Sequence, residues 1–445
     1  MTDAPNIVLI VLDTMRKDVL SAYGGAAKTP NLDSLADDGL VYPSCVAPSP
    51  WTVPSHASLF TGKYPSQHGV HESREVKIPR TFDLMANATG ETITSYLEQR
   101  GYNAVGYSAN PSIAPGSGFD DAFNAFALVD ATKGSEREAE AIAWASKYGK
   151  TKQEVTRNLL RRGRISDLWR LYRMSKEIER REKLRDYPRM KGGDALAALL
   201  SDTSFEQPFF LFVNLFEMHE PYVKDEPTPM MDLFGKKTIG AAMLEEIRKR
   251  YAQEAVLVDS FLGSVVSYLK RCGIYDESLV VVTSDHGQEL KEHGFYGHGT
   301  FLHREIVEVP LIVKYPGNRK EASAPGHQTL IGIPEMVKDS LAGVVDGRSL
   351  SAQSVFSESF GIPHGLEGVE RLAGFQSRRE AIDRPRKAVY REGYRLVVDG
   401  AAGSIEEFDF GGKQAKAPDH KEAVNEMLEE LRSLAGPGFS VPAPI

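Results

Sequence analysis

The sequence predicts a doubly wound α/β fold: a mostly parallel sheet flanked by helices, with a helical insert and a small C-terminal α+β subdomain. Continuous apolar runs rich in Val and Ile indicate strands that are buried on both faces, as in a parallel sheet. These runs alternate along the chain with segments of helical periodicity, which is the pattern of a doubly wound fold. Asp and His residues follow two of the runs, and ligands gather at the carboxyl ends of such strands.

The first strand is predicted over Asn6–Leu12, a nearly continuous apolar segment that ends at Asp13. A helix follows, which we expect Asn31 to cap and which presents Leu32 and Leu35 on its apolar face. The two patterns then alternate along the chain. The further predicted elements are a helix over Thr92–Arg100, strands over Ala104–Tyr107 and Phe209–Asn214, a helix over Tyr251–Leu269, and strands over Ser278–Thr283 and Val309–Val313.

A basic stretch, Lys147–Lys191, interrupts this alternation. It contains sixteen Lys and Arg but only six Asp and Glu, a net charge of +10, and because the whole chain carries −8, the remainder carries −18. Leu and aromatic residues recur in it at helical spacing, which predicts two or three helices in an insert at about residues 131–195. The arginines either face solvent and pair with acidic neighbours, or form a lid or docking surface for an anionic substrate or an acidic partner.

The segment from about residue 351 onward changes in character. It predicts a smaller C-terminal subdomain over 351–445, beside a catalytic α/β domain over 1–350. Within it, Ala388–Asp399 is typical of a β-hairpin that turns at Glu392 and Gly393. The other elements predicted in this subdomain are a strand over Ser404–Phe410 and an amphipathic helix over Ala423–Leu434.

Composition and charge exclude several classes of protein. A net charge of −8 argues against a general nucleic-acid binder. The apolar runs stay well below the ~18 residues that span a bilayer, and the N-terminal residues lack the features of a secretory signal. The two cysteines, Cys45 and Cys272, cannot form a disulfide scaffold and suit a reducing compartment. We therefore expect a cytoplasmic protein without a transmembrane segment.

The strongest local signal is the segment Ser49–Gly62, SPWTVPSHASLFTG. Pro54 suits the first turn of a helix, where its missing N–H costs no hydrogen bond, so Thr52 lies at the helix N-terminus. Backbone N–H groups and the helix dipole favour an anion there. A hydroxyl at this position is well placed to become a nucleophile if a metal also coordinates it; otherwise it caps the helix.

Asp285 and His286 follow a buried strand, as Asp13 follows the first one. A carboxylate and an imidazole together suit a hard or borderline divalent cation. The alternative for this pair is an Asp that caps the next helix beside a surface His. With Thr52, these residues form a consistent set of oxygen and nitrogen ligands at the strand ends of one sheet. The set suits calcium, manganese, magnesium or zinc, of which we favour calcium or manganese.

Two further histidines lie near these strand ends. His219 lies just beyond the strand Phe209–Asn214, and His298 lies in a glycine-rich loop after His286. Histidine is suited to protonating a leaving group near neutral pH. Each of the two is therefore a candidate general acid, with a hydrogen-bonded structural histidine as the alternative.

The motifs that contain these residues resemble those of the sulfatase family, within the alkaline phosphatase superfamily. The resemblance covers nearly the whole chain apart from the basic insert, and it implies an alkaline-phosphatase-like fold and one divalent metal ion. It is carried by NIVLIVLDTMRKD, SPWTVPSHASLFTGKYPSQHGV, FLFVNLFEMHEPY and VVVTSDHGQELKEHGFYGHGTFLHREIVEVPLIV. The implied metal ligands are Asp13, Thr52, Asp285 and His286, and the residues implied to contact the ester or its leaving group are His219 and His298.

Three departures from the family pattern bear on mechanism. Typical sulfatases have Cys or Ser where Thr52 stands and oxidise it to formylglycine; threonine carries a methyl group on its β-carbon, so the geminal-diol mechanism is not open to it. His56 replaces the usual Arg, which removes a fixed cation beside the nucleophile, and we include His56 among the candidate catalytic residues. Asp13 and Thr14 stand where the family has paired acidic residues.

These observations favour a metal-dependent hydrolase of small or oligomeric anionic esters, with Thr52 as nucleophile. Activated water hydrolyses a phospho-threonine, whereas a sulfo-threonine lacks the elimination that a geminal diol offers. Mechanism therefore slightly favours phosphodiesters, phosphonates or phosphomonoesters. The family resemblance favours sulfate esters, so a sulfatase without formylglycine is one alternative, beside a phosphoryl transferase and a non-catalytic binding protein. The oligomeric state stays open.

Overall fold

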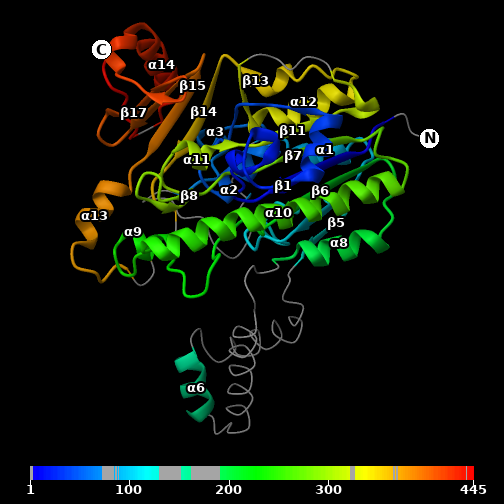
Figure 1. Cartoon of the computed structure of the whole chain (residues 1–445), viewed down its shortest axis with the longest axis horizontal. Helices are drawn as coiled ribbons and strands as arrows, with labels where there is room; N and C mark the ends of the chain where they lie inside the picture. Colours follow the sequence, from blue (N-terminus) through cyan, green and yellow to red (C-terminus); the bar gives the residue numbers. More distant parts are fainter. Residues whose placement is uncertain are drawn as a thin grey trace.

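A computed structural model of the chain describes residues 4–72, 85, 88, 90–129, 152–161, 191–320, 326–363, 366, 369–436 and 438–445. Within these residues, a seven-stranded central sheet lies between two groups of helices, and an antiparallel C-terminal sheet lies beside it (Figure 1). The predicted α/β fold with a mostly parallel sheet is confirmed. The predicted division into domains at residue 351 stays a prediction.

The central sheet has the strand order β2-β11-β7-β1-β6-β4-β5. Strands β7, β1, β6, β4 and β5 are parallel to one another, whereas β11 is antiparallel to both of its neighbours. The carboxyl ends of β1, β6 and β7 consequently meet at one edge of the sheet. The strands are β1 (Ile7–Leu12), β2 (Leu40–Val41), β4 (Asn103–Ser108), β5 (Ala125–Leu128), β6 (Phe209–Leu215), β7 (Leu279–Thr283) and β11 (Leu311–Lys314).

Both faces of this sheet are buried, as the continuous apolar runs predict. Along β1 the even-numbered side chains face a core that includes α1, α8 and α10, and the odd-numbered ones face a core that includes α2, α4 and α12. Figure 1 shows the long helix α10 crossing one face of the sheet. These helices are α1 (Pro30–Asp38), α2 (Thr52–Thr61), α4 (Ile93–Glu98), α8 (Gly193–Asp202), α10 (Ala241–Arg271) and α12 (Ile333–Leu341).

Two predicted elements are wrong in detail, for reasons of local chemistry. The strand predicted over Val309–Val313 is split at Pro310, which lacks an N–H; Val309 pairs in a different sheet, and β11 begins after the proline. Asn31 does not cap α1, because the helix begins at Pro30 and the Asn31 side chain donates to Asp259 Oδ2 on α10 at 2.9 Å. A proline thus sets the start of β11 as well as that of α1.

The smaller elements surround the carboxyl edge of the central sheet. A four-stranded sheet has the order β10-β3-β12-β13, and β8 pairs with β9 in a hairpin. These strands are β3 (Cys45–Val46), β8 (Glu289–Leu290), β9 (Tyr296–Gly297), β10 (Glu308–Val309), β12 (His327–Thr329) and β13 (Ser351–Ala352). Short helices are α3 (Pro65–His68), α9 (Pro229–Leu233), α11 (Arg304–Val307) and α13 (Phe375–Ile382).

The C-terminal part forms a five-stranded antiparallel sheet covered by α14 (Figure 1). The predicted hairpin is present as β15 and β16, and it turns at Glu392 and Gly393, both of which have positive φ. The elements are β14 (Ser354–Ser359), β15 (Arg386–Arg391), β16 (Tyr394–Asp399), β17 (Ser404–Phe410), β18 (Lys413–Gln414) and α14 (Lys421–Ser433).

The basic insert falls mostly outside the described residues. Helix α6 (Lys152–Arg161) is described, whereas residues 130–151 and 162–190 are not. The acidic partner predicted for the insert therefore stays a prediction. Of the helices that the structure describes, none combines the length and apolar character needed to cross a membrane.

Candidate active site

Asp13 and Asp285 follow neighbouring parallel strands. Asp13 directly follows β1, and only Ser284 separates Asp285 from β7. Because these strands end at the same edge, both carboxylates lie there together with His286. One ligand atom from each of the three lies within 4.8 Å of the other two, and all three side chains are buried. We call Asp13, Asp285, His286 and Thr52 the buried cluster.

Two carboxylate oxygens of the buried cluster have no hydrogen-bond partner among the described residues: Asp13 Oδ1 and Asp285 Oδ2. The other two are bonded, since Asp13 Oδ2 accepts from Asn110 Nδ2 at 2.6 Å and Asp285 Oδ1 accepts from the His286 N–H at 2.9 Å. Burial and the charge of Asp285 raise the pKa of Asp13 well above its usual range. Buried carboxylate oxygens without partners are costly, and a bound cation offsets that cost. The residues therefore fit the divalent metal that the sequence predicts.

Thr52 brings its hydroxyl to the same place. It is the first residue of α2, whose N-cap is Trp51, so Thr52 does not cap the helix. Its Oγ1 lies 3.2 Å from His286 Nε2. His286 Nδ1 lies 2.9 Å from the carbonyl oxygen of Gly287, so Nδ1 carries the N–H and Nε2 holds the lone pair. Burial lowers the pKa of His286, which keeps the ring neutral and suited to metal ligation.

His56 lies one helical turn after Thr52 and is fully buried. Its Nδ1 donates to the Thr52 carbonyl oxygen at 3.0 Å, and its Nε2 accepts from Asn214 Nδ2 at 2.9 Å. Phe119 and Phe212 pack edge-on around the ring. Burial lowers the pKa of His56, so the ring is neutral and supplies no fixed cation. The structure thus places His56 against the backbone of Thr52, in the first turns of α2.

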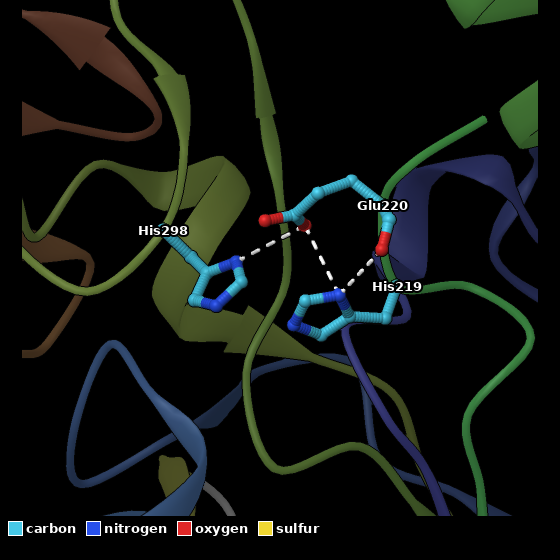
Figure 2. Close-up of side chains that lie close together, drawn as sticks. All are labelled: His219, Glu220 and His298. Atoms are coloured by element: carbon cyan, nitrogen blue, oxygen red, sulfur yellow. Dashed lines mark hydrogen bonds and ion pairs between the residues drawn. The ribbon is translucent and has the colours of Figure 1, made fainter. Parts of the chain in front are cut away.

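A second group of ligand-type side chains is less buried, and we call His219, Glu220 and His298 the outer cluster (Figure 2). Glu220 Oε2 lies 3.4 Å from His219 Nδ1 and 3.7 Å from His298 Nδ1. Gln288 bridges the group, because its Nε2 donates to Glu220 Oε2 at 2.9 Å and its Oε1 lies 2.7 Å from His298 Nδ1. One carboxylate therefore lies between two imidazoles.

The two clusters adjoin. The ring centroids of His286 and His298 are 4.4 Å apart, and those of His298 and His219 are 5.0 Å apart. The structure therefore brings every predicted site residue into one region, although their chemical roles stay predictions. The predicted site residues are Asp13, Thr52, His56, His219, Asp285, His286 and His298.

Buried charged side chains, chiefly Lys191 and Glu217, hold the loop that carries His219 in place. Lys191 Nζ donates to the Glu217 carbonyl oxygen at 2.8 Å and also to the carbonyl oxygen of His219. Glu217 Oε1 in turn accepts from the backbone N–H of Lys191 and of Gly193. Glu254 on α10 is buried beside them, and burial raises its pKa to about 7. These contacts fix the end of the insert to the outer cluster.

Sequence reasoning missed several residues of the site. Glu220 directly follows His219, and Gln288 lies two residues after His286. Their places in these motifs could have marked both as site residues. Asn110 and Asn214 carry no such signal in the sequence. Asn110 contacts Asp13 and Asn214 contacts His56, and an isolated Asn near a strand end reveals neither partner.

Comparison with known proteins assigns the chain to a family. The profile of the sulfatase family matches residues 5–332. An N-acetylglucosamine-6-O-sulfatase of Bacteroides thetaiotaomicron is 22% identical over 386 residues, which cover 72% of this chain but only 65% of that relative. The multifunctional alkaline phosphatase superfamily protein PehA of Trinickia caryophylli is 25% identical over 422 residues, 78% of this chain and 76% of the relative.

Solved structures share the fold over almost the full chain. A 2-O GAG sulfatase has a TM-score of 0.65 at 16% identity, with 97% of this chain and 92% of that chain covered. The phosphonate monoester hydrolase of Agrobacterium radiobacter has a TM-score of 0.62 at 19% identity, with coverages of 97% and 95%. The family profile spans most of the chain, and the fold agrees with it. The chain therefore belongs to the sulfatase family, within the alkaline phosphatase superfamily, a family of ester hydrolases.

Proposed function

We propose that this chain hydrolyses anionic phosphoryl esters, with Thr52 as the nucleophile. One observation carries the proposal: the Thr52 hydroxyl lies at the start of α2, 3.2 Å from the lone-pair nitrogen of His286. In the same cluster, two carboxylate oxygens have no hydrogen-bond partner among the described residues. That arrangement suits a hydroxyl that becomes an alkoxide. A threonine that only caps a helix needs neither the imidazole nor the carboxylates nearby.

Asp13, Thr52, Asp285 and His286 would hold the divalent cation, with calcium or manganese favoured. When bound, such a cation lowers the pKa of a ligated hydroxyl and neutralises charge on the non-bridging oxygens of an ester. The chain itself contributes the first turn of α2, whose N–H groups have no partners within the helix and favour an anion.

The reaction has two steps that balance in atoms and protons. With the cation bound, Thr52 Oγ1 would already have lost its proton to solvent, and it would leave phosphorus again as the alkoxide in the second step. In the first step it forms a bond to phosphorus while the bond from phosphorus to the leaving oxygen breaks, and an imidazolium at His219 or His298 gives that oxygen its proton. The carboxylate of Glu220 lies between the two rings. The neutral imidazole then takes a proton from water as the water oxygen attacks phosphorus, and the bond to Thr52 breaks. His56 holds the Thr52 turn and touches no reacting atom, so we assign it a positioning role.

The phosphoryl assignment rests on how the intermediate is released. Water displaces Thr52 from phosphorus directly, whereas a sulfated threonine has no hydroxyl on the same carbon through which sulfate could be eliminated. The fold is shared with a phosphonate monoester hydrolase and with sulfatases, and each similarity supports ester hydrolysis by this chain. The chemistry of Thr52 favours the first kind of substrate.

Turnover of aryl phosphate monoesters, aryl phosphodiesters, aryl phosphonates and aryl sulfates by one metal-loaded preparation tests the proposal. We expect a phosphoryl ester to be cleaved fastest, and Thr52→Ala to lower kcat/KM by ~10³-fold or more. Thr61→Ala is the matched control, since Thr61 lies at the other end of α2 and bonds the Ala57 carbonyl oxygen. Faster cleavage of the sulfate, or full activity in Thr52→Ala, would contradict the proposal.

A further inference from the structure

We infer that a pocket between the C-terminal sheet and the segment that begins at α3 binds a small aromatic carboxylate. The pocket has a volume of about 480 Å³, within the ~300–1,000 Å³ range of small-molecule sites, which often lie where two parts of a fold meet. The described residues that line it include no member of the buried cluster or the outer cluster. We call it the junction pocket, and the lining residues on which the inference depends most are His71, Glu358, Phe360, Arg384, Lys387 and Phe439.

The junction pocket is built by segments that are far apart in sequence. His71 follows α3, Phe360 follows β14, and Phe439 lies in the C-terminal tail. The tail is held against the C-terminal sheet, because the Ser440 N–H donates to the Gly400 carbonyl oxygen at 2.8 Å. The walls of the pocket are therefore in place before a ligand arrives, as in most small-molecule sites.

The two buried carboxylates of the junction pocket already have donors from the protein. Glu358 Oε1 accepts from Ser66 Oγ at 2.8 Å and from the Lys387 ammonium, and its Oε2 accepts from the Ser66 N–H at 2.7 Å. Asp383 accepts from a backbone N–H at 2.8 Å and from Arg379 Nε at 2.9 Å. Both carboxylates are thus paired and hydrogen-bonded without a ligand, which argues against a site for a cation.

Two nitrogen groups of the pocket, in contrast, have hydrogen-bonding capacity left. Arg384 uses Nε on the Glu380 carbonyl oxygen and Nη1 on Asp399 Oδ2, each at 2.8 Å, and its Nη2 makes no hydrogen bond within the described residues. His71 Nδ1 is buried and has no partner among them either. A buried polar atom without a partner is costly, and a ligand oxygen that accepts a hydrogen bond there offsets the cost. A guanidinium in particular suits a carboxylate.

The other charges around the pocket nearly cancel. Lys387 pairs with Glu358, and Arg384 pairs with Asp399. Burial lowers the pKa of His71, so its ring is neutral. Glu380 also lines the pocket, but it is exposed, and solvent screens its charge. The unused donors, and not the net charge, therefore favour a ligand with an anionic end.

Aromatic side chains supply the apolar part of the pocket. The ring of Phe360 stacks on that of His71, with centroids 3.6 Å apart and planes 9° apart. The ring of Phe439 packs against Gly400 and lies 5.4 Å from the Lys387 ammonium. Rings of this kind favour a flat apolar body, which packs on them face to face or edge to face. A benzene ring that carries a carboxylate combines both features.

Calorimetric titration of the full-length, metal-loaded chain with sodium benzoate tests the inference. We expect a Kd of ~1 mM, which is typical of a ligand with so few atoms, and binding of benzylammonium and benzyl alcohol that is at least ~10-fold weaker. Arg384→Gln should weaken benzoate binding by ~10-fold or more, because it removes a charged hydrogen-bond donor. Thr52→Ala should bind benzoate like the wild type, because Thr52 does not line the pocket.

A variant that fills the pocket without removing a charge gives the second test. Ala401 is exposed and lines the pocket, so Ala401→Phe should abolish binding. Ala402→Phe is the matched control, since Ala402 is equally exposed but is not among the lining residues, and it should bind benzoate like the wild type. Saturating benzoate should raise the Tm of the wild type and of Ala402→Phe but not that of Ala401→Phe. The same melts show that each variant folds.

Three results would overturn the inference: no binding of benzoate to the wild type, unchanged binding in both Arg384→Gln and Ala401→Phe, or tighter binding of benzylammonium than of benzoate. The proposed function fails by a different result, which is full turnover in Thr52→Ala. The two outcomes are independent, because benzoate binding is measured without turnover and turnover without benzoate.

Discussion

The buried cluster and the outer cluster use similar donors but are held in different ways. Asp13 and Asp285 follow strands of the central sheet and have almost no exposed surface. The outer residues lie on loops, where His219 is 21% exposed, Glu220 13% and His298 8%. Within the part of the chain that the structure describes, two carboxylate oxygens of the buried cluster have no hydrogen-bond partner, whereas Gln288 and two imidazoles surround the carboxylate of Glu220.

This difference suggests separate tasks for the two clusters: the buried one holds the cation, and the outer one contacts the substrate. The buried carboxylates are costly without a cation, so they should bind one tightly and need it for folding stability. The outer residues contact one another without an ion, so their arrangement should not need a cation for stability. We expect the buried cluster to activate the nucleophile and the outer cluster to meet the leaving group.

The largest effect is expected from Asp285→Asn. It removes one charge and one ligand from the buried cluster, so we expect ~10³-fold lower kcat/KM. Metal should raise the Tm of the wild type but not that of the variant, because a ligand that binds the folded state stabilises it. Thermal melts with and without manganese measure this. A variant whose Tm still rises with metal as much as the wild type would break the division.

Glu220→Gln should have the next largest effect. It removes the charge of the outer cluster but leaves the buried one intact, so we expect ~10²-fold lower kcat and an unchanged shift of Tm at low metal concentration. The matched control is Glu305→Gln, whose carboxylate pairs with His293. Equal losses of activity in both variants would point to general destabilisation and not to the leaving group.

Lys191→Met tests how the outer loop is positioned. Its ammonium bonds the carbonyl oxygens of Glu217 and His219, so its loss should shift the imidazole and lower kcat ~10-fold with little change in KM. Lys191→Arg keeps a donor and should restore part of the loss. If both variants equal the wild type in kcat, the loop is positioned by other contacts.

Glu254→Gln should have the smallest effect, and on stability alone. Burial raises the pKa of Glu254 to about 7, so the folded state holds a proton that the unfolded state loses near pH 4.5. Stability from this group is therefore complete below about pH 4.5 and falls as the pH rises to about 7, by at most ~3 kcal/mol. The variant should match the wild type near pH 5 and melt higher at pH 8. Equal Tm values at pH 8 would refute the assignment.

The sequence predicts the buried cluster well because its residues are tied to strand ends. Asp13 and Asp285 follow apolar runs whose parallel pairing brings their ends together, and Thr52 is located by Pro54 in the same helix. The local pattern therefore implies the three-dimensional arrangement. The sheet was predictable for the same reason, apart from β11, whose antiparallel direction leaves no mark on a short apolar run.

The outer cluster and its supports were less predictable. Glu220 and Gln288 contact each other across 68 residues of sequence, and nothing local reveals that pairing. The positioning role of His56 also depends on Asn214, which lies on another strand. Asn31 failed as a cap because α1 begins at Pro30, and its side chain contacts Asp259 on α10 instead. Long-range polar contacts are thus the part of the site that the sequence does not reveal.

A covalent intermediate on Thr52 tests the central claim most directly. The metal-loaded protein is mixed with an aryl phosphodiester, quenched in acid during the first turnover, digested and analysed by peptide mass spectrometry. We predict a phosphoryl group on Thr52, lost on longer incubation and absent from Thr52→Ala. Product release in the first turnover with no modification of Thr52, or with a modification on another residue, would contradict the claim.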